Sequence, residues 1–174
     1  MTLLVLTAVG DDREGLVSAL SRAVEAHGGN WLDSQLARLA GKFAGIVLVD
    51  VPEENVRAFT DAAAGLREQI GWKVDSTPAG DGGEAGRAVH VHLVGLDRSG
   101  MVRRVSAALA EQHVSIHRFR SWTHDAPQGG GLLFEAEAVV TLPHGVEEET
   151  VRRALEPIAD ELVVDLELLE HDAS

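Results

Sequence analysis

The residues in this sequence that could do chemistry lie in a short glycine and aspartate segment that occurs twice. Residues 9–17 read VGDDREGLV, and residues 94–102, which start 85 positions later (94 − 9 = 85), read VGLDRSGMV. An apolar run leads into each copy and a helical pattern follows it. Such a segment presents free backbone N–H groups at the start of a helix, where an anion can bind. The alternative is a capped turn that holds no ligand.

The types of residue in the segment suggest how each one is used. Gly10 lets the chain leave the strand at an unusual φ, and Asp12 can cap the first free N–H groups of the helix. Gly15 falls in the first helical turn, where the missing side chain lets a small ligand or another backbone approach. The second copy has the corresponding residues Gly95, Asp97 and Gly100.

The usual signatures of an enzyme are missing from the sequence. It has no cysteine, which excludes disulfides, thiolate zinc sites and cysteine nucleophiles. The spacing from Gly10 to Gly15 lacks the Lys-Ser/Thr pair of a phosphate-binding loop. Ser18 and His27 fall on one predicted helix, too far apart to hydrogen bond. We therefore expect neither catalysis nor a cofactor.

Two further groups of side chains have both a functional and a simpler interpretation. His90 and His92 alternate along a predicted strand, and His124 could share their face, which would suit a metal ion. No carboxylate at a suitable spacing completes such a site, so solvated histidines are the simpler interpretation. The basic residues concentrate at Arg103, Arg104, Arg118 and Arg120. They form either a patch for an anionic partner protein or a solvated surface.

Charge and hydropathy exclude several classes of function. The formal net charge of −13 and the pI near 4.9 disfavour direct binding to nucleic acid or to an anionic membrane. The first residues lack the basic region of a signal peptide, and no apolar run approaches the roughly 18 residues of a membrane span. We expect a cytoplasmic protein that touches neither nucleic acid nor membrane.

Hydrophobic periodicity predicts the same order of elements in each copy. In the first copy the predicted elements, in the order strand, helix, strand, strand, helix, strand, are 3–9, 13–27, 30–39, 43–51, 56–70 and 72–77. In the second copy they are 88–94, 98–112, 114–124, 132–142, 151–162 and 163–169. The proline after the hairpin moves by 91 positions (143 − 52 = 91). The second hairpin is therefore six residues longer (91 − 85 = 6), near residues 125–131.

This βαββαβ order predicts an α+β sandwich of the ferredoxin-like kind in each half. We expect one domain at 1–77, a glycine-rich linker at 78–86 and a second domain at 87–174. Leu4 and Leu6 should face the helices, which turns Val5 and Thr7 to the opposite, outer face of the sheet. The hairpins add Asp33 and Gln35 to this face in the first copy, and Arg118 and Arg120 in the second. We hypothesise that the outer faces or strand edges pack together, within the chain or in a dimer; simple solvation is the alternative.

The repeated segment and the residues after it resemble those of a known family. The pattern Val-Gly-x-Asp-Arg-x-Gly-Leu/Met-Val precedes a helix, and Asn30-Trp31-Leu32-Asp33 and a Gly-x-Phe hairpin follow. These features resemble the ACT domain. The tandem arrangement is similar to the double-ACT proteins of the glycine cleavage system repressor type, over about residues 3–170.

The resemblance implies a regulatory module that binds a small molecule, usually an amino acid. In ACT domains the ligand binds at the turn between the first strand and the first helix, and at interfaces between paired domains. The matching residues of the first unit are Gly10, Asp11, Asp12, Gly15, Leu16 and Asn30. Those of the second unit are Gly95, Asp97, Gly100 and Ser115. Ser115 departs from the family's usual asparagine, and His113-Val114 replaces a glycine pair.

The ligand that the resemblance implies is a small neutral amino acid, with glycine or serine as the first expectation. Its α-carboxylate suits the helix amides near Gly15, and its α-ammonium would pair with Asp12 and Asn30. The carboxylates of Asp11 and Asp12 disfavour a second negative charge. We expect a non-catalytic, homodimeric regulator that acts on a partner protein, for example in the transcription of glycine metabolism genes. A protein-interaction adaptor or a regulatory subunit without a small ligand is the alternative; the Asp12–Gly15 turn and Asn30 favour the first.

Overall fold

The chain folds into two compact units, residues 1–81 and 82–174. The computed structural model describes residues 1–80, 86–127, 130–159 and 162–168. Most of the predicted linker, residues 81–85, lies outside the described residues. The predicted linker 78–86 begins with the last residue of one strand, Pro78, and ends with the first residue of the next, Gly86.

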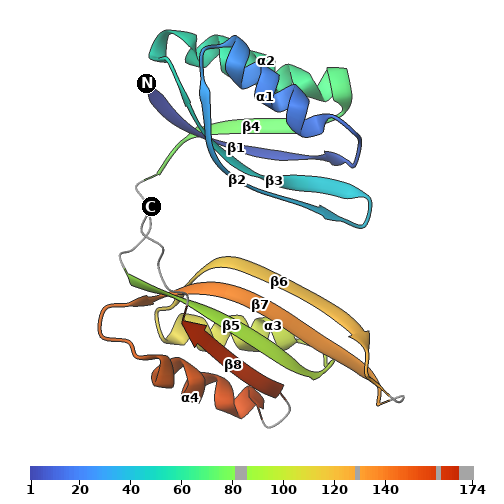
Figure 1. The fold of residues 1–174 in the computed structure, drawn as a ribbon, viewed down its shortest axis with the longest axis vertical. Helices are drawn as coiled ribbons and strands as arrows, with labels where there is room; N and C mark the ends of the chain where they lie inside the picture. The colour runs from blue at the N-terminus through green and yellow to red at the C-terminus, as the bar shows by residue number, and fades with distance from the viewer. Residues whose placement is uncertain (81–85, 128–129, 160–161, 169–174) are drawn as a thin grey trace. The chain divides into compact units, whose positions relative to one another are not determined.

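The first unit is a four-stranded antiparallel sheet with both helices on one face (Figure 1). Its elements are β1 (Thr2–Asp11), α1 (Leu16–Ala26), β2 (Asn30–Leu39), β3 (Lys42–Val51), the short 3₁₀ helix η1 (Glu53–Asn55), α2 (Val56–Ile70) and β4 (Lys73–Pro78). The strand order is β2-β3-β1-β4, so β2 and β4 are the edge strands. Strand β1 extends two residues beyond the predicted end, and helix α1 begins at residue 16 rather than 13.

The second unit repeats this architecture element by element (Figure 1). Its elements are β5 (Gly86–Leu96), α3 (Met101–Glu111), β6 (Ser115–Asp125), β7 (Leu132–Pro143), α4 (Glu148–Ala159) and β8 (Leu162–Leu168). The strand order β6-β7-β5-β8 matches that of the first sheet. The predicted tandem ferredoxin-like fold is confirmed.

The core of the first unit lies between the sheet and the helices. Alternate residues of β1, Leu4, Leu6 and Ala8, are buried, as the strand period requires. Helix α1 buries Leu16, Leu20 and Val24, which recur every four residues on one face. Phe59 and Trp72 are fully buried among them. The prediction that Leu4 and Leu6 face the helices is confirmed.

An irregularity recurs at matched positions of the two edge strands. The register of β2 against β3 shifts between Trp31 and Asp33, and that of β6 against β7 shifts between Ile116 and Arg118. A bulge of this kind bends the strand and increases its twist. The two sheets therefore share a local backbone shape as well as a strand order.

In the described part of the chain, no helix is long and apolar enough to cross a membrane.

Candidate functional site

The first turn, residues 10–15, comprises the last two residues of β1 and the four residues that join β1 to α1. Gly15 is in the left-handed conformation (φ 83°) and is the N-cap of α1, without a side-chain cap. The first helical hydrogen bond runs from the N–H of Ala19 to the carbonyl of Gly15, at 2.8 Å. The N–H groups of Leu16, Val17 and Ser18 precede this bond, so the helix itself gives them no partner.

The expectation that Asp12 caps the helix is wrong. Its carboxylate accepts a hydrogen bond from Arg38 Nη1 at 3.0 Å, on the hairpin strand β2. Because Gly15 occupies the N-cap, no side chain stands where a cap would form. The same holds for Asp97, since Gly100 (φ 86°) is the N-cap of α3 and that helix also has no side-chain cap.

Both carboxylates of the first turn are paired with cations of the hairpin. Asp11 pairs with Lys42, and Asp12 pairs with Arg38. The hydrogen bond from Lys42 lowers the pKa of the Asp11 carboxyl below its usual range. These pairs offset the negative charge of the turn, so it does not repel an anion as strongly as the sequence indicates.

Gly10 has a different role from the predicted one. It lies within β1, opposite Phe43, rather than at a positive φ. A Cβ atom there would lie 2.6 Å from Cδ1 of Trp72 and 2.9 Å from the carbonyl oxygen of Gly71. Glycine is thus needed because the buried indole packs directly against the backbone.

A hollow of about 370 Å³ opens beside the first turn. It is lined by Asp12, Arg13, Gly15, Leu16, Val17, Ser18 and Phe43. Cavities of this size accept small molecules. The hollow combines first-turn amides that suit a carboxylate with a carboxylate that suits an amine.

The structure separates Asn30 from this turn. Asn30 pairs with Asp50, which pairs with Leu3 near the start of β1. Asp11 is eight residues further along β1 (11 − 3 = 8), about 26 Å at the rise of an extended strand. The expectation that Asp12 and Asn30 of one unit hold the same ligand is therefore wrong. The backbone N–H of Asn30 instead donates a hydrogen bond to Asp50 Oδ1 on the neighbouring strand, at 3.1 Å.

The turn of the second unit has the same backbone and a different charge. The N–H of Asp97 bonds to the carbonyl of Leu132 at 2.8 Å, as that of Asp12 bonds to Gly41 at 2.9 Å. Leu96, Leu133 and Thr123 occupy the positions of Asp11, Lys42 and Arg38. Gly95 lies opposite Phe134 in the strand, as Gly10 lies opposite Phe43. The ion pairs of the first turn therefore have no counterpart at these positions.

Ser115 is as far from its turn as Asn30 is from the first one. It pairs with Thr141, which pairs with Ala88 near the start of β5. Gly95, Asp97 and Gly100 lie at the other end of that strand. The ten predicted site residues thus form two turn clusters and two separate strand starts.

Sequence reasoning missed a polar network on the outer face of the second sheet. Glu135 accepts hydrogen bonds from Trp122 Nε1 (3.1 Å) and pairs with His92 Nε2 (2.8 Å), while His124 Nδ1 lies 3.6 Å away. The hydrogen bond with His92 lowers the pKa of Glu135. The alternation of Glu135 and Glu137 with buried Phe134, Ala136 and Ala138 was the signal that could have found it. Within the described residues, no group of three or more His, Asp or Glu side chains could hold a metal ion.

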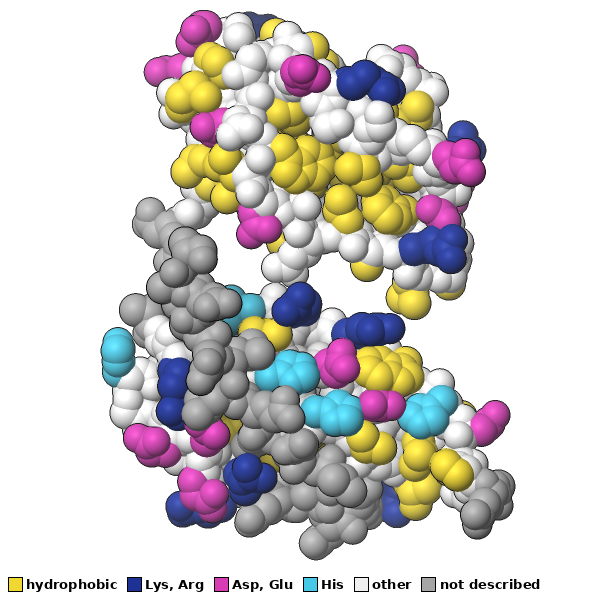
Figure 2. All heavy atoms as spheres, in the orientation of Figure 1, with side chains coloured by type: hydrophobic (Ala, Val, Ile, Leu, Met, Phe, Trp, Pro, Cys, Tyr) yellow, Lys and Arg dark blue, Asp and Glu magenta, His cyan; other side chains and the backbone are white. Residues whose placement is uncertain are grey.

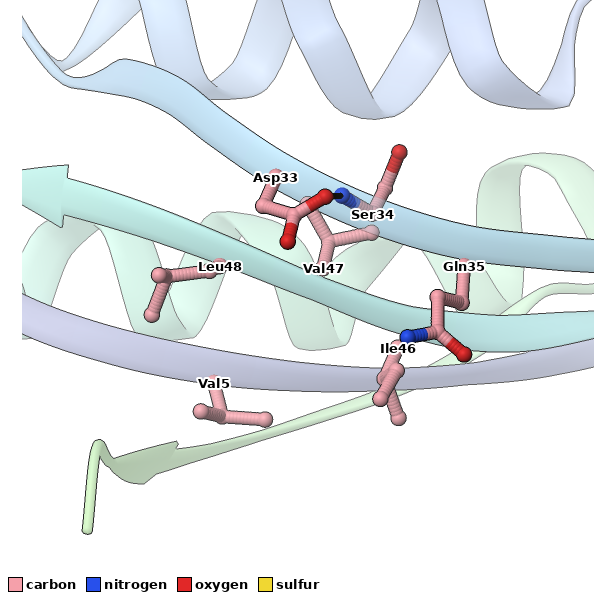
Figure 3. A pocket seen from close by; sticks show the side chains of 7 residues that line it. All are labelled: Val5, Asp33, Ser34, Gln35, Ile46, Val47 and Leu48. Carbon is pink, nitrogen blue, oxygen red and sulfur yellow. Dashed lines mark hydrogen bonds between the residues drawn. The ribbon is translucent and has the colours of Figure 1, made fainter. Parts of the chain in front are cut away.

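It also missed hollows on the outer faces of both sheets. Figure 3 shows the first, about 170 Å³, lined by Val5, Asp33, Ser34, Gln35, Ile46, Val47 and Leu48. The second, about 310 Å³, is lined by His90, Arg118, Arg120, Glu137, Ala138 and Val139. The strand alternation predicted that Val5, Asp33, Gln35 and the two arginines lie on outer faces. Alternation does not predict whether such a face is flat or hollowed.

Comparison with known proteins agrees with this architecture. Residues 2–76 match the model of the ACT domain family. A crystal structure of an unknown protein from Galdieria sulphuraria is 28% identical, with a TM-score of 0.85 over 97% of this chain and 99% of that one. A candidate glycine cleavage system transcriptional repressor is 18% identical, with a TM-score of 0.74 over 98% of each chain. No curated protein matches the sequence.

The family model matches the whole first unit up to β4, and the second unit repeats that fold in the same order of strands and helices. Residues 2–76 are thus similar to the ACT domain family, and the chain carries the fold of that family twice in tandem.

Proposed function

We propose that the protein is a non-catalytic regulator whose first unit binds a small neutral amino acid, glycine or serine first, in the hollow beside the first turn. One observation carries the proposal: the N–H groups at the start of helix α1, which have no partner within the helix, and the carboxylate of Asp12 lie around the same small hollow. The α-carboxylate would bind the N–H groups of Leu16, Val17 and Ser18 beside Arg13. The α-ammonium would face the carboxylate of Asp12.

The dimensions and the charge of the hollow support a small ligand. Phe43 and Leu16 form apolar walls, and the hollow lies against the helix terminus rather than extending across the sheet. The cations that pair with Asp11 and Asp12 leave the turn close to neutral, which suits a zwitterion better than an anion or a cation.

We further propose that a homodimer completes the site with Asn30 of the partner subunit. Strand β2 is an edge strand, with one row of backbone groups unpaired within its own sheet. In an antiparallel pair the start of one strand lies beside the end of the other. The end of β2, at Leu39, lies opposite Lys42, which lies opposite Asp11. Antiparallel pairing of two β2 strands would therefore bring the partner's Asn30 toward the turn.

The regulator would act through another protein. The net charge of −13 opposes direct binding to DNA. The similarity in fold to a candidate glycine cleavage system transcriptional repressor supports a role in the transcription of glycine metabolism genes, in the cytoplasm. An adaptor without a small ligand is the second candidate. It is favoured by the pairs of Asp11 with Lys42 and Asp12 with Arg38, which satisfy the turn when it is empty.

A thermal unfolding screen against the twenty amino acids tests the proposal. A ligand at about 100 times its dissociation constant adds roughly 2.7 kcal/mol to the stability of the native state. For a unit of this size that raises the midpoint by about 10 °C or more. Glycine or serine should raise the unfolding midpoint of the first unit, followed by Trp31 and Trp72 in a Trp122→Phe background. Asp12→Ala should abolish this first-unit shift, and the matched variant Asp97→Ala in the second turn should retain it. If no amino acid raises the midpoint, the adaptor is favoured instead.

A further inference from the structure

The outer face of the second sheet carries a second place where charge gathers around a hollow. The hollow of about 310 Å³ lies over β5, β6 and β7. Arg118 lies opposite Val139, which lies opposite His90, and Arg120 lies opposite Glu137 in the next row. The strand register therefore brings two guanidinium groups, an imidazole and a carboxylate together around this hollow. Figure 2 shows arginine, histidine and acidic side chains together on the visible side of this unit.

Within the described residues, the charged side chains of this hollow do not neutralise one another by ion pairing. Among the described residues, the side chains of Arg118 and Glu137 make no hydrogen bond or ion pair. Arg120 and Glu137 form no ion pair there either, although they are direct cross-strand neighbours. The guanidinium of Arg120 lies over the ring of Trp122, at 4.8 Å from its centroid. Trp122 is itself held by its hydrogen bond to Glu135. Stacking positions Arg120 while leaving the N–H groups at its edge available.

The first unit shows that the hollow comes from the backbone and the charge from the side chains. Its smaller hollow lies at the matched positions, since Val5, Asp33 and Gln35 are 85 residues before His90, Arg118 and Arg120 (Figure 3). On the third strand, Ile46 and Leu48 are 91 residues before Glu137 and Val139. An apolar, acidic lining in one unit thus corresponds to an arginine-rich lining in the other.

We propose that the hollow formed by His90, Arg118, Arg120 and Glu137 is a binding site for an amino-carboxylate. The carboxylate of the ligand bridges the guanidinium groups of Arg118 and Arg120, which offer paired N–H donors of matching geometry. The amine of the ligand binds the carboxylate of Glu137. His90 closes the side of the hollow on β5 as a further hydrogen-bonding group.

The site is distinct from the turn of the same unit. Leu96, the last residue of β5, lies six residues beyond His90 (96 − 90 = 6), about 20 Å along the strand. Glu137 and the strongly negative chain discriminate against ligands that carry a second carboxylate. The arginines discriminate against simple amines. The two preferences together select ligands that carry one group of each sign.

The test is an amide-resolved NMR titration of the full chain with glycine, and with acetate and methylammonium as single-charge probes. Glycine should shift the backbone signals of residues 118–120 and 137–139. Arg118→Gln and Arg120→Gln should each weaken this binding at least tenfold, the scale of a lost charge-assisted hydrogen bond. Arg57→Gln, which removes an exposed arginine of α2, should leave it unchanged. Glu137→Gln should weaken glycine binding and leave acetate binding intact.

The same titration separates this site from the proposed amino-acid site of the first turn. Asp12→Ala should remove shifts at residues 12–18 and preserve those at 118–120. The inference is overturned if those strand signals do not move with glycine, or move equally with sodium chloride of the same ionic strength. It is also overturned if Glu137→Gln affects glycine and acetate alike. Concentration-dependent broadening of these signals without ligand, removed by Arg118→Glu, would identify the face as a contact between copies and would likewise overturn it.

Discussion

Replacing Gly15 with alanine isolates the cost of the backbone conformation at the first turn. Gly15 has φ 83°, and a Cβ atom built there meets no atom within 4 Å. An L-residue in the left-handed region costs about 1–2 kcal/mol. Alanine also lowers the entropy of the unfolded chain, which offsets about 0.4–1 kcal/mol. We expect a net loss of about 1 kcal/mol in the free energy of unfolding of the first unit.

The same substitution at Gly65 is the matched control, with the opposite sign. Gly65 lies within α2, where the nearest atom to an added Cβ is the side-chain nitrogen of Gln69 at 3.9 Å. Glycine inside a helix costs roughly 0.5–1 kcal/mol relative to alanine. Gly65→Ala should therefore stabilise the unit. Gly15→Asn should lose less than Gly15→Ala, because asparagine tolerates the left-handed region better.

Urea and thermal unfolding followed by tryptophan fluorescence measure these changes. A Trp122→Phe background leaves Trp31 and Trp72, both in the first unit, as the reporters. A loss of about 1 kcal/mol lowers the midpoint of a unit of this size by about 4–8 °C. A Gly15→Ala variant as stable as its parent, alongside a stabilised Gly65→Ala variant, would refute the left-handed N-cap. The turn would then have another conformation in solution.

Three further predictions follow from the described contacts. Gly10→Ala should cost about 1–3 kcal/mol, more than Gly15→Ala in the same urea assay, because the added carbon meets Trp72 and the backbone of Gly71. Phe59→Ala should cost about 3–5 kcal/mol, since this side chain is fully buried, and calorimetry should show the loss in one of two transitions. His92→Gln should raise the pKa of Glu135, measured by carboxyl NMR. In the native protein the lowered pKa of Glu135 stabilises the fold at pH values above the carboxyl's ordinary pKa near 4.5, and this stabilisation is lost as the pH falls through the pKa of the folded state. His92→Gln should therefore make the free energy of unfolding depend less on pH in that range.

The elements and the fold could be predicted from the sequence because the evidence for them is local and occurs twice. Alternation in β1 and the fourfold spacing in α1 report which side of each element is buried. The repeat then makes each copy a check on the other. The remaining errors are at the ends of elements: strand β1 continues to Asp11, and helix α1 begins only at Leu16, after its N-cap Gly15.

The partners of the turn carboxylates could not be predicted in this way. Asp12 and Arg38 are 26 residues apart and meet only because β3 aligns the end of β2 with the end of β1. Such a contact depends on the register of three strands. A capping residue, by contrast, is predicted from three or four neighbouring positions, and at Asp12 that local rule gave the wrong partner.

The separation of Asn30 from the turn had a signal in the sequence. The helix between two parallel strands carries the chain back to the end of the sheet where the first strand began. Strands β1 and β2 therefore begin at the same end of the sheet. The turn follows the end of β1, and Asn30 begins β2. The βαβ order alone places them at opposite ends, and a ligand that needs both groups needs a second domain to supply one of them.

The two units assign polar chemistry to different parts of one backbone. In the first unit the charged pairs surround the turn, and the hollow of the outer face is lined by apolar side chains such as Val5, Ile46 and Leu48, with Asp33 as its one charged residue. In the second unit leucines occupy the turn positions of Asp11 and Lys42, and charges occupy the outer face. Because the backbone hydrogen bonds of the turns and the bulges of the edge strands are shared, side-chain replacement alone accounts for this exchange. A duplicated fold of this kind can therefore hold two recognition surfaces of different specificity without a change in topology.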